Sequence, residues 1–132
     1  MSTQTQTMQS SASIVWFEIP ADNVERAKSF YRDLFGWNIE KFPGPMDYWH
    51  LDTGGPDASP DGGLMQRQNP GQQGITTYFN VPSVDQFVVK VQKLGGKICM
   101  PKTPVPQMGY FAMCQDTENN MFALWEKNEN AK

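Results

Sequence analysis

Two side chains in this sequence are the main candidates for acid–base chemistry, because of the segments in which they lie. His50 is the only histidine and stands in the aromatic segment DYWHLDT, whereas Glu18 stands in the apolar segment IVWFEIP. A carboxylate in a largely buried strand must find a partner or change its pKa, because burying it unpaired is costly. We expect Glu18 to be a general base or an anchor for a ligand; the alternative is pairing with a lysine or arginine across the sheet or a dimer seam. His50 is the second acid–base candidate, although a lone histidine on a strand is more often a hydrogen-bonded residue of a pocket wall or the surface than a catalyst.

The two cysteines and the glycine-rich segment point to simpler roles. Cys99 and Cys114 lie too far apart in sequence for a close-spaced metal motif, and nothing indicates an oxidising compartment. We expect two free, buried thiols. The segment GGPDASPDGG lacks the lysine and following helix of a phosphate-binding loop, so it predicts a turn-rich loop.

Composition restricts the class of protein. A chain of 132 residues fits one compact domain, and its net charge of −3 provides no basic field for nucleic acid. No apolar run approaches the roughly 20 residues that span a bilayer. The segment MSTQTQTMQSSAS lacks the apolar core of a signal peptide, so we expect a disordered tail over residues 1–12 and a cytoplasmic protein without a membrane partner.

A strand followed by a helix opens the folded part. Residues 14–19 alternate so that one strand face is wholly apolar, and apolar residues then recur at helical spacing from Val24 to Phe35. Asp22 with Glu25 makes a capping pattern that predicts a helix start near residues 22–24, and Gly36 ends the run. The segments WNIEKF, DYWHLDT and GGLMQRQ predict three further strands.

The same order of elements repeats about 60 residues later. ITTYFNV predicts the strand, Ser83 with Gln86 predicts a helix start near 83–84, and MGYFAMCQDT repeats MDYWHLDT at an offset near 62. We therefore predict an α+β fold of two β-α-β-β-β modules within one domain, residues 13–128. Module one covers about 13–70 and module two about 74–127.

Two helices on one side of the strands leave the other sheet face free to curl into a cup. Val15, Phe17 and Ile19 make the better helix-packing face, so Trp16 and Glu18 should face the cup. A concave sheet with a few polar groups among aromatics is a usual small-molecule site. The alternatives are that Trp16 belongs to the core and that the aromatic surface packs against a second subunit. The predicted ligand-binding residues are Trp16, Glu18, Tyr48, His50, Thr76, Tyr78 and Tyr110.

These segments resemble the vicinal oxygen chelate superfamily, which includes glyoxalase I, extradiol dioxygenases and the fosfomycin- and bleomycin-resistance proteins. The resemblance covers Ser13 to Glu126 and is strongest in WFEIPADNVERAKSFYRDLFGW, VPSVDQFVVKVQKLGGKI, MGYFAMCQDTENNMFALWE and the internal duplication. More narrowly, the chain looks like the branch of predicted enzymes related to lactoylglutathione lyase. The resemblance implies a glyoxalase-like fold: a cupped, eight-stranded mixed sheet with helices on the outer face, often in a homodimer.

The same resemblance implies where a metal would bind. Metal-dependent members carry four ligands, usually His or Gln, Glu, His and Glu, on the first and last strand of each module. The matching positions here are Trp16, Gly63, Thr76 and Ala123. Indole, methyl and hydrogen side chains offer no ligand to a divalent cation, and a lone threonine hydroxyl is a poor one. We therefore expect no metal and no other cofactor.

Three functions compete. The first is a metal-free protein that binds a small, partly aromatic or hydrophobic molecule in the cup, as bleomycin-resistance proteins sequester a drug. The second is a metal-independent isomerase or lyase acting beside a carbonyl, with Glu18 or His50 moving the proton. The third is a glyoxalase-type metalloenzyme with rearranged ligands. We rank them in that order and expect a homodimer.

Overall fold

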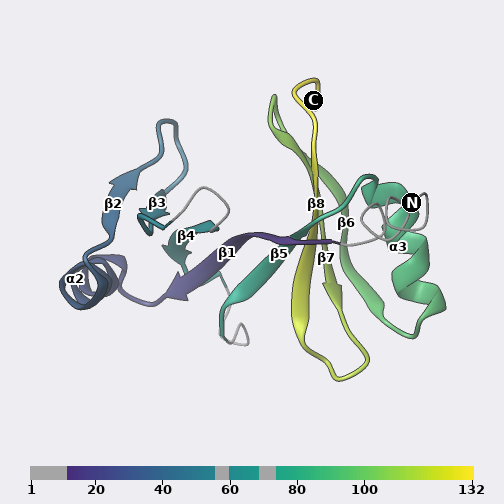
Figure 1. The fold of residues 1–132 in the computed structure, drawn as a ribbon, viewed down its shortest axis with the longest axis horizontal. Helices are drawn as coiled ribbons and strands as arrows, with labels where there is room; N and C mark the ends of the chain where they lie inside the picture. Colours follow the sequence, from purple (N-terminus) through teal and green to yellow (C-terminus); the bar gives the residue numbers. More distant parts are fainter. Residues whose placement is uncertain (1–11, 56–59, 69–73) are drawn as a thin grey trace, which may run out of the picture. The chain divides into compact units, whose positions relative to one another are not determined.

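The structure is a computed structural model that describes residues 12–55, 60–68 and 74–132. Nearly all of the predicted disordered tail lies outside the described residues. Contacts divide the chain into two units, Val15–Thr76 and a second unit that contains Thr77–Lys132, and these units correspond to the two predicted modules (Figure 1). Each module is described below by itself.

Module one contains four strands and one helix. Its strand order is β2-β3-β4-β1, with β1 parallel to β4 and the other neighbours antiparallel. The sheet is therefore mixed. The elements are β1 (Ile14–Ala21), α2 (Val24–Phe35), β2 (Asn38–Lys41), β3 (Tyr48–Asp52) and β4 (Asp61–Gln66).

The capping residue of helix α2 lies one position after the predicted one. The side chain of Asn23, rather than Asp22, accepts a hydrogen bond from the backbone N–H of Arg26. Asp22 instead bonds Arg67, with 2.8 Å between Oδ1 and Nε. A cap of this kind stabilises a helix by roughly 0.5–2 kcal/mol. Gly36 ends the helix at a positive φ of 73°, as predicted, because glycine adopts this conformation without steric cost.

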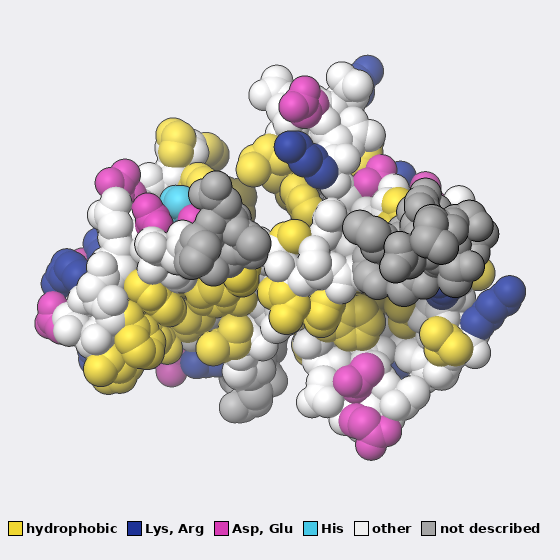
Figure 2. All heavy atoms as spheres, in the orientation of Figure 1, with side chains coloured by type: hydrophobic (Ala, Val, Ile, Leu, Met, Phe, Trp, Pro, Cys, Tyr) yellow, Lys and Arg dark blue, Asp and Glu magenta, His cyan; other side chains and the backbone are white. Residues whose placement is uncertain are grey.

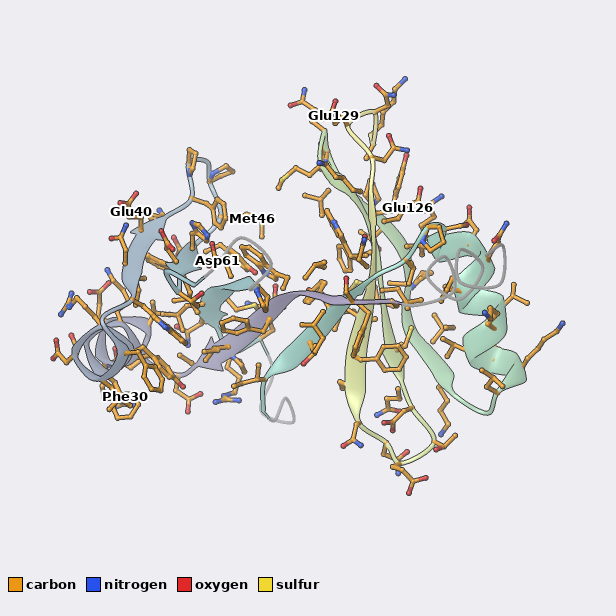
Figure 3. All side chains as sticks on the ribbon, in the orientation of Figure 1. Phe30, Glu40, Met46, Asp61, Glu126 and Glu129 are labelled. Atoms are coloured by element: carbon orange, nitrogen blue, oxygen red, sulfur yellow. The ribbon has the colours of Figure 1, made fainter. Side chains whose placement is uncertain are left out.

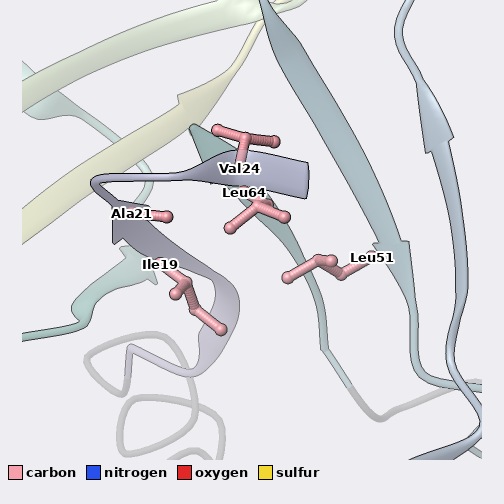
Figure 4. Packing of buried hydrophobic residues seen from close by; sticks show 5 residues of the cluster. All are labelled: Ile19, Ala21, Val24, Leu51 and Leu64. Carbon is pink, nitrogen blue, oxygen red and sulfur yellow. The ribbon is translucent and has the colours of Figure 1, made fainter. Parts of the chain in front are cut away.

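The core of module one lies between α2 and its sheet. Five buried side chains meet there, from β1, α2, β3 and β4 (Figure 4). Phe17 and Tyr31 pack against this cluster. The side chains of Phe17 and Ile19 therefore lie on the face of β1 that packs against α2, as the alternation predicted. The five residues are Ile19, Ala21, Val24, Leu51 and Leu64.

Module two repeats this plan. Ser83 caps its helix by accepting from the backbone N–H of Gln86, which confirms the predicted start. The strand order is β5-β8-β7-β6, with β5 parallel to β8 and the other neighbours antiparallel. The elements are β5 (Thr76–Asn80), α3 (Val84–Lys93), β6 (Lys97–Val105), β7 (Gly109–Gln115) and β8 (Met121–Lys127). The core residues are Val81, Val84, Ala112, Cys114 and Leu124.

The α+β class and the two β-α-β-β-β modules are confirmed. One expectation about the thiols was wrong: Cys114 is buried, but Cys99 is exposed. Cys99 lies on β6, which is an edge strand of its sheet, and follows the inward-facing Ile98, so alternation turns it outward. Within the described residues, neither helix is long and apolar enough to cross a membrane.

Candidate functional site

One face of the module-one sheet, opposite α2, carries most of the predicted site residues; we call it the open face. Trp16 and Glu18 alternate on β1 with Phe17 and Ile19, which pack toward α2. Strand pairing continues this face across the sheet, because directly opposed residues share a face. The sequence-based prediction of which β1 residues share a face therefore agrees with the structure.

A chain of hydrogen bonds crosses the open face. The indole Nε1–H of Trp16 donates to the hydroxyl oxygen of Tyr48 over 2.9 Å. That hydroxyl donates in turn to Oε2 of Glu18 over 2.7 Å. A bond to a carboxylate is stronger than one between neutral groups, so Glu18 holds the Tyr48 hydroxyl and the hydroxyl holds the indole. Three predicted ligand-binding residues are thus linked directly.

Gly63 makes this chain possible. In the strand register Gly63 lies opposite both His50 on β3 and Glu18 on β1. A Cβ atom at Gly63 would overlap the Tyr48 hydroxyl and ring, so only glycine leaves room for this tyrosine. The Tyr48 hydroxyl therefore occupies the space where a side chain at position 63 would begin.

His50 is oriented by a carboxylate that the sequence reasoning missed. Its Nε2 lies 3.0 Å from Oδ2 of Asp61. The other oxygen of Asp61 accepts from the backbone N–H of Thr53 over 3.0 Å and from the Thr53 hydroxyl over 3.2 Å. Burial alone would raise the pKa of Asp61, but the hydrogen bonds from Thr53 and His50 outweigh it and lower that pKa below its usual range. Asp61 stays ionised and fixed in place beside the imidazole.

Aromatic rings cover the space around these polar groups. The rings of Trp16 and His50 stack with centroids 5.7 Å apart and planes 10° from parallel. Phe42 lies 5.5 Å from His50, 5.5 Å from Tyr48 and 6.3 Å from Trp16, centroid to centroid. We call these six residues the polar-aromatic cluster. Its members are Trp16, Glu18, Phe42, Tyr48, His50 and Asp61.

The remaining predicted site residues belong to β5 and β7. Thr76 and Tyr78 are buried. Strand alternation places both on the opposite face of β5 from Val81, which belongs to the core of module two. Tyr110 packs against the α3-side core, and Lys102 lies 4.3 Å from its ring centroid. The structure therefore places the Tyr110 ring on the helix side, away from the face that carries Met113 and Ala123 in module two.

The reason for the displaced Tyr110 is a shift in the repeat. The sequence alignment paired Tyr48 with Tyr110 at an offset of 62. In the structure Trp49 opposes Leu64 and Ala112 opposes Leu124, so the matching strands correspond at an offset of 63. Phe111, rather than Tyr110, is therefore the module-two counterpart of Tyr48. A one-residue slip reverses the face of every side chain in a strand.

Asp61 and Phe42 were not predicted as site residues. Asp61 lies within the segment GGPDASPDGG, which the sequence predicted to be a turn-rich loop, but its last three residues, 61–63, belong to β4. Phe42 follows β2 before another turn. Strand alternation from Gly63 would have placed Asp61 on the same face as His50. No local signal marked Phe42, because its ring meets Trp16 and His50 only through the pairing of β2 with β3.

The four positions where related metalloproteins place ligands do not fit a divalent metal. Trp16 uses its only polar atom as a donor, and Gly63 has no side chain and is covered by Tyr48. Thr76 and Ala123 are buried, without a carboxylate or imidazole at either position. Among the described residues, no group of three or more His, Cys, Asp or Glu side chains could hold a metal ion.

A hollow of module one lies away from this cluster. It has a volume of about 400 Å³ and lies at the start of α2. Trp49, which packs toward α2, lines it, whereas none of the six cluster residues does. The hollow and the polar-aromatic cluster are therefore separate features. Its other lining residues are Asp22, Asn23, Val24, Glu25, Asp47 and Gln66.

Comparison with known proteins gives the class. A model of bleomycin resistance protein-like N-terminal domains matches residues 13–54. A glyoxylase-like domain-containing protein of Didymella fabae is 32% identical over 112 residues, which cover 81% of this chain and 88% of that protein. A Mycobacterium bovis protein with the name "Putative glyoxylase CFP32" is 24% identical over 85% of this chain, but the match spans 43% of that protein's own length.

Structural comparison agrees with the sequence matches. The crystal structure of a glyoxalase/bleomycin resistance protein/dioxygenase superfamily member from Vibrio splendidus has a TM-score of 0.65 and 15% identity, covering 89% of this chain and 100% of its own. The chain belongs to the glyoxalase/bleomycin resistance/dioxygenase superfamily, also called the vicinal oxygen chelate superfamily, and has a glyoxalase-like fold.

Proposed function

We propose that this protein binds a small, partly aromatic molecule on the open face of module one, by a mechanism that needs no metal. The observation that carries the proposal is the double engagement of Trp16, which stacks on His50 and donates to Tyr48. An indole fixed in this way offers a flat apolar surface beside the carboxylate of Glu18. Such a surface suits a planar ligand that also carries a polar group.

The hydrogen bond of Glu18 supports this proposal. Its Oε2 accepts from the Tyr48 hydroxyl over 2.7 Å, which places the carboxylate beside the Trp16 indole. The described residues also give no group suited to a rearranged metal site, so nothing here favours a metalloenzyme. The homodimer and the cytoplasmic location stay predictions.

A ligand screen read out at the tryptophans tests the proposal. The four indole N–H groups give separate nitrogen-15 NMR signals, and a planar ligand should shift the Trp16 signal. Trp16→Ala should weaken binding, because stacking contributes roughly 0.5–1.5 kcal/mol beyond burial. Glu18→Gln should also weaken it, because a polar group that loses its partner costs about 1–3 kcal/mol.

A matched control is available in the same module. Trp37 stacks on Tyr31 beside α2, with ring centroids 5.4 Å apart, and lies outside the polar-aromatic cluster. Trp37→Phe should leave ligand affinity unchanged, whereas Trp16→Phe should reduce it. If Trp16→Ala and Glu18→Gln keep full affinity, or unfold the protein, the two residues serve the core or an interface and the ligand site lies elsewhere.

A further inference from the structure

Two sulfur atoms approach each other in module two, on the sheet face that points away from α3. The thiol Sγ of Cys99 lies 3.8 Å from the thioether Sδ of Met121. The two residues come from β6 and β8, which are not neighbours because β7 runs between them. A thiol is a weak hydrogen-bond donor and a thioether is a weak acceptor, so this contact adds little to stability. The pair is better explained by what its two sulfur atoms can bind together.

The backbone of β6 directs Cys99 to this face. The register of β6 against β7 shifts between Ile98 and Met100, so Cys99 is the extra residue of a β-bulge. Bulges of this kind change the direction of a side chain. Met121 reaches the same face by ordinary alternation, because the next residue of β8, Phe122, packs against the core under α3. An irregular strand and a regular one thus bring the two sulfur atoms together.

This face is open to an incoming ion and carries further thioethers. Cys99 is exposed, and Met121 is 39% exposed. Met100 lies opposite Met113 in the strand register, and Met113 alternates on β7 with the buried Cys114. A methionine side chain has three rotatable bonds, so its sulfur can adapt to a bound group. One thiol and three thioethers therefore share the face.

Oxygen and nitrogen donors lie elsewhere. Glu126, labelled in Figure 3, is the only acidic residue within the described strands β6, β7 and β8, and its carboxylate accepts from the backbone N–H of Val84 at the start of α3. His50, the only histidine of the chain and cyan in Figure 2, belongs to module one. Thiolate and thioether ligands select soft cations such as Cu(I), whereas zinc sites are built from Cys, His and carboxylates. The donor set therefore favours Cu(I).

We infer that Cys99 and Met121 form a binding site for a soft monovalent cation, Cu(I). Two metal–sulfur bonds of about 2.3 Å at an angle of about 120° place their sulfur atoms about 4.0 Å apart. The observed separation of 3.8 Å therefore needs little adjustment. Binding replaces the S–H bond of Cys99 with a metal–sulfur bond and releases one proton to solvent, while the copper keeps its oxidation state. The site belongs to module two and is independent of the ligand proposed for module one.

Competition with bicinchoninate, a coloured Cu(I) chelator, tests the inference in oxygen-free buffer with ascorbate. The wild type should withdraw one Cu(I) per chain, read as loss of the absorbance of the complex. Cys99→Ser should lower the affinity about a hundredfold or more, and Met121→Leu about tenfold, because leucine keeps the volume and removes the sulfur. Met108→Leu is the matched control, since Met108 is exposed in module two but lies between β6 and β7, and it should change nothing. Equal affinities of the wild type and Met121→Leu would overturn the inference, because a lone thiol would then explain binding.

Silver(I), a soft cation of the same charge, tests the contact directly. In protein labelled with carbon-13 at the methionine methyl groups, one equivalent of Ag(I) should shift the NMR signal of Met121 and leave that of Met108 in place. Cys99→Ser should abolish the shift. An unmoved Met121 signal would overturn the inference. Displacement of Cu(I) by an equal concentration of Zn(II) would also overturn it, because the site would then not select a soft monovalent cation.

Discussion

The two modules share a fold but not a chemistry. Residues 15–76 carry nine acidic and five basic side chains, a net charge of −4, whereas the rest of the chain carries five acidic and six basic, a net charge of +1. On the open face of module one, carboxylates lie among aromatic rings. In module two, the face of β7 and β8 that points away from α3 carries apolar residues instead. They are Phe111, Met113, Ala123 and Trp125.

Equivalent positions show how the difference arose. Gly63 and Ala123 correspond in the two modules, and so do His50 and Met113 at the offset of 63. The missing Cβ at Gly63 admits the Tyr48 hydroxyl, and a histidine in place of Met113 recruits Asp61. Duplication therefore preserved the helix-side packing in both modules, while the open face was free to differ.

The largest expected effect is that of Gly63→Ala. The new Cβ would overlap Tyr48, so the tyrosine must move and its bonds to Trp16 and Glu18 break. We expect a loss of about 1–3 kcal/mol in the free energy of unfolding by urea, with loss of ligand binding. In a Tyr48→Ala background the same change should cost much less. Equal costs in the two backgrounds would show that Gly63 and Tyr48 are not coupled.

Removing a single tyrosine hydroxyl in each module is a smaller change that compares their contributions to stability. Tyr48→Phe deletes the group that links Trp16 to Glu18, and we expect it to cost about 1–2 kcal/mol. Tyr110→Phe should cost less than about 0.5 kcal/mol, because its described contacts involve the ring: the core under α3 and Lys102. Urea unfolding curves measure both. A larger effect at Tyr110 would reverse the proposed difference between the modules.

The charge difference predicts a preference among ligands. A planar cation such as N-methylquinolinium should bind the open face about tenfold more tightly than neutral quinoline, through cation–π contact and the carboxylates. Glu18→Gln should reduce the preference, whereas Glu25→Gln on the exposed side of α2 should not. Isothermal titration at low and high salt measures this, and equal affinities in wild type would rule out a role for the charge.

Low pH should destabilise module one partly through protonation of Asp61. Because its pKa is lowered in the folded protein, Asp61 stabilises the fold above the usual carboxyl range, and this stabilisation is lost as pH falls through the lowered pKa. Asp61→Asn should therefore flatten part of the acid limb in a plot of melting temperature against pH. Asp116, whose pKa is lowered by backbone N–H groups of Asn120 and Glu118, gives the module-two comparison. Identical acid limbs for wild type and Asp61→Asn would contradict the prediction.

The smallest effect concerns the thiols of module two. Burial raises the pKa of Cys114 to about 11, so it stays protonated and unreactive at neutral pH, whereas Cys99 is exposed. Iodoacetamide should label Cys99 alone in the native protein and both residues after denaturation, without changing stability. Mass spectrometry reads this directly. Native labelling of Cys114 would show that the core of module two opens, and the assay also checks that core in each module-one variant.

The sequence by itself determined the repeated order of elements and the faces of β1. Alternation and helical spacing are local properties, so Phe17 and Ile19 could be assigned to the core, and Trp16 and Glu18 to the other face, without a structure. The absence of ligand-type side chains at Trp16 and Gly63 was equally readable. The cap of α2 was missed by one residue, because Asp22 and Asn23 are both good capping residues and only the backbone decides between them.

The tertiary structure decided which side chains meet. Asp61 and His50 are eleven residues apart and come together only because β3 and β4 pair in one register, and a one-residue shift of that register would separate them. The same is true of Trp16 and Tyr48, which are 32 residues apart. They form a hydrogen bond in the space that Gly63 leaves by having no Cβ atom. Strand pairing is a non-local property, so the sequence supplied the candidate residues and their faces, and the register of the sheet made them a site.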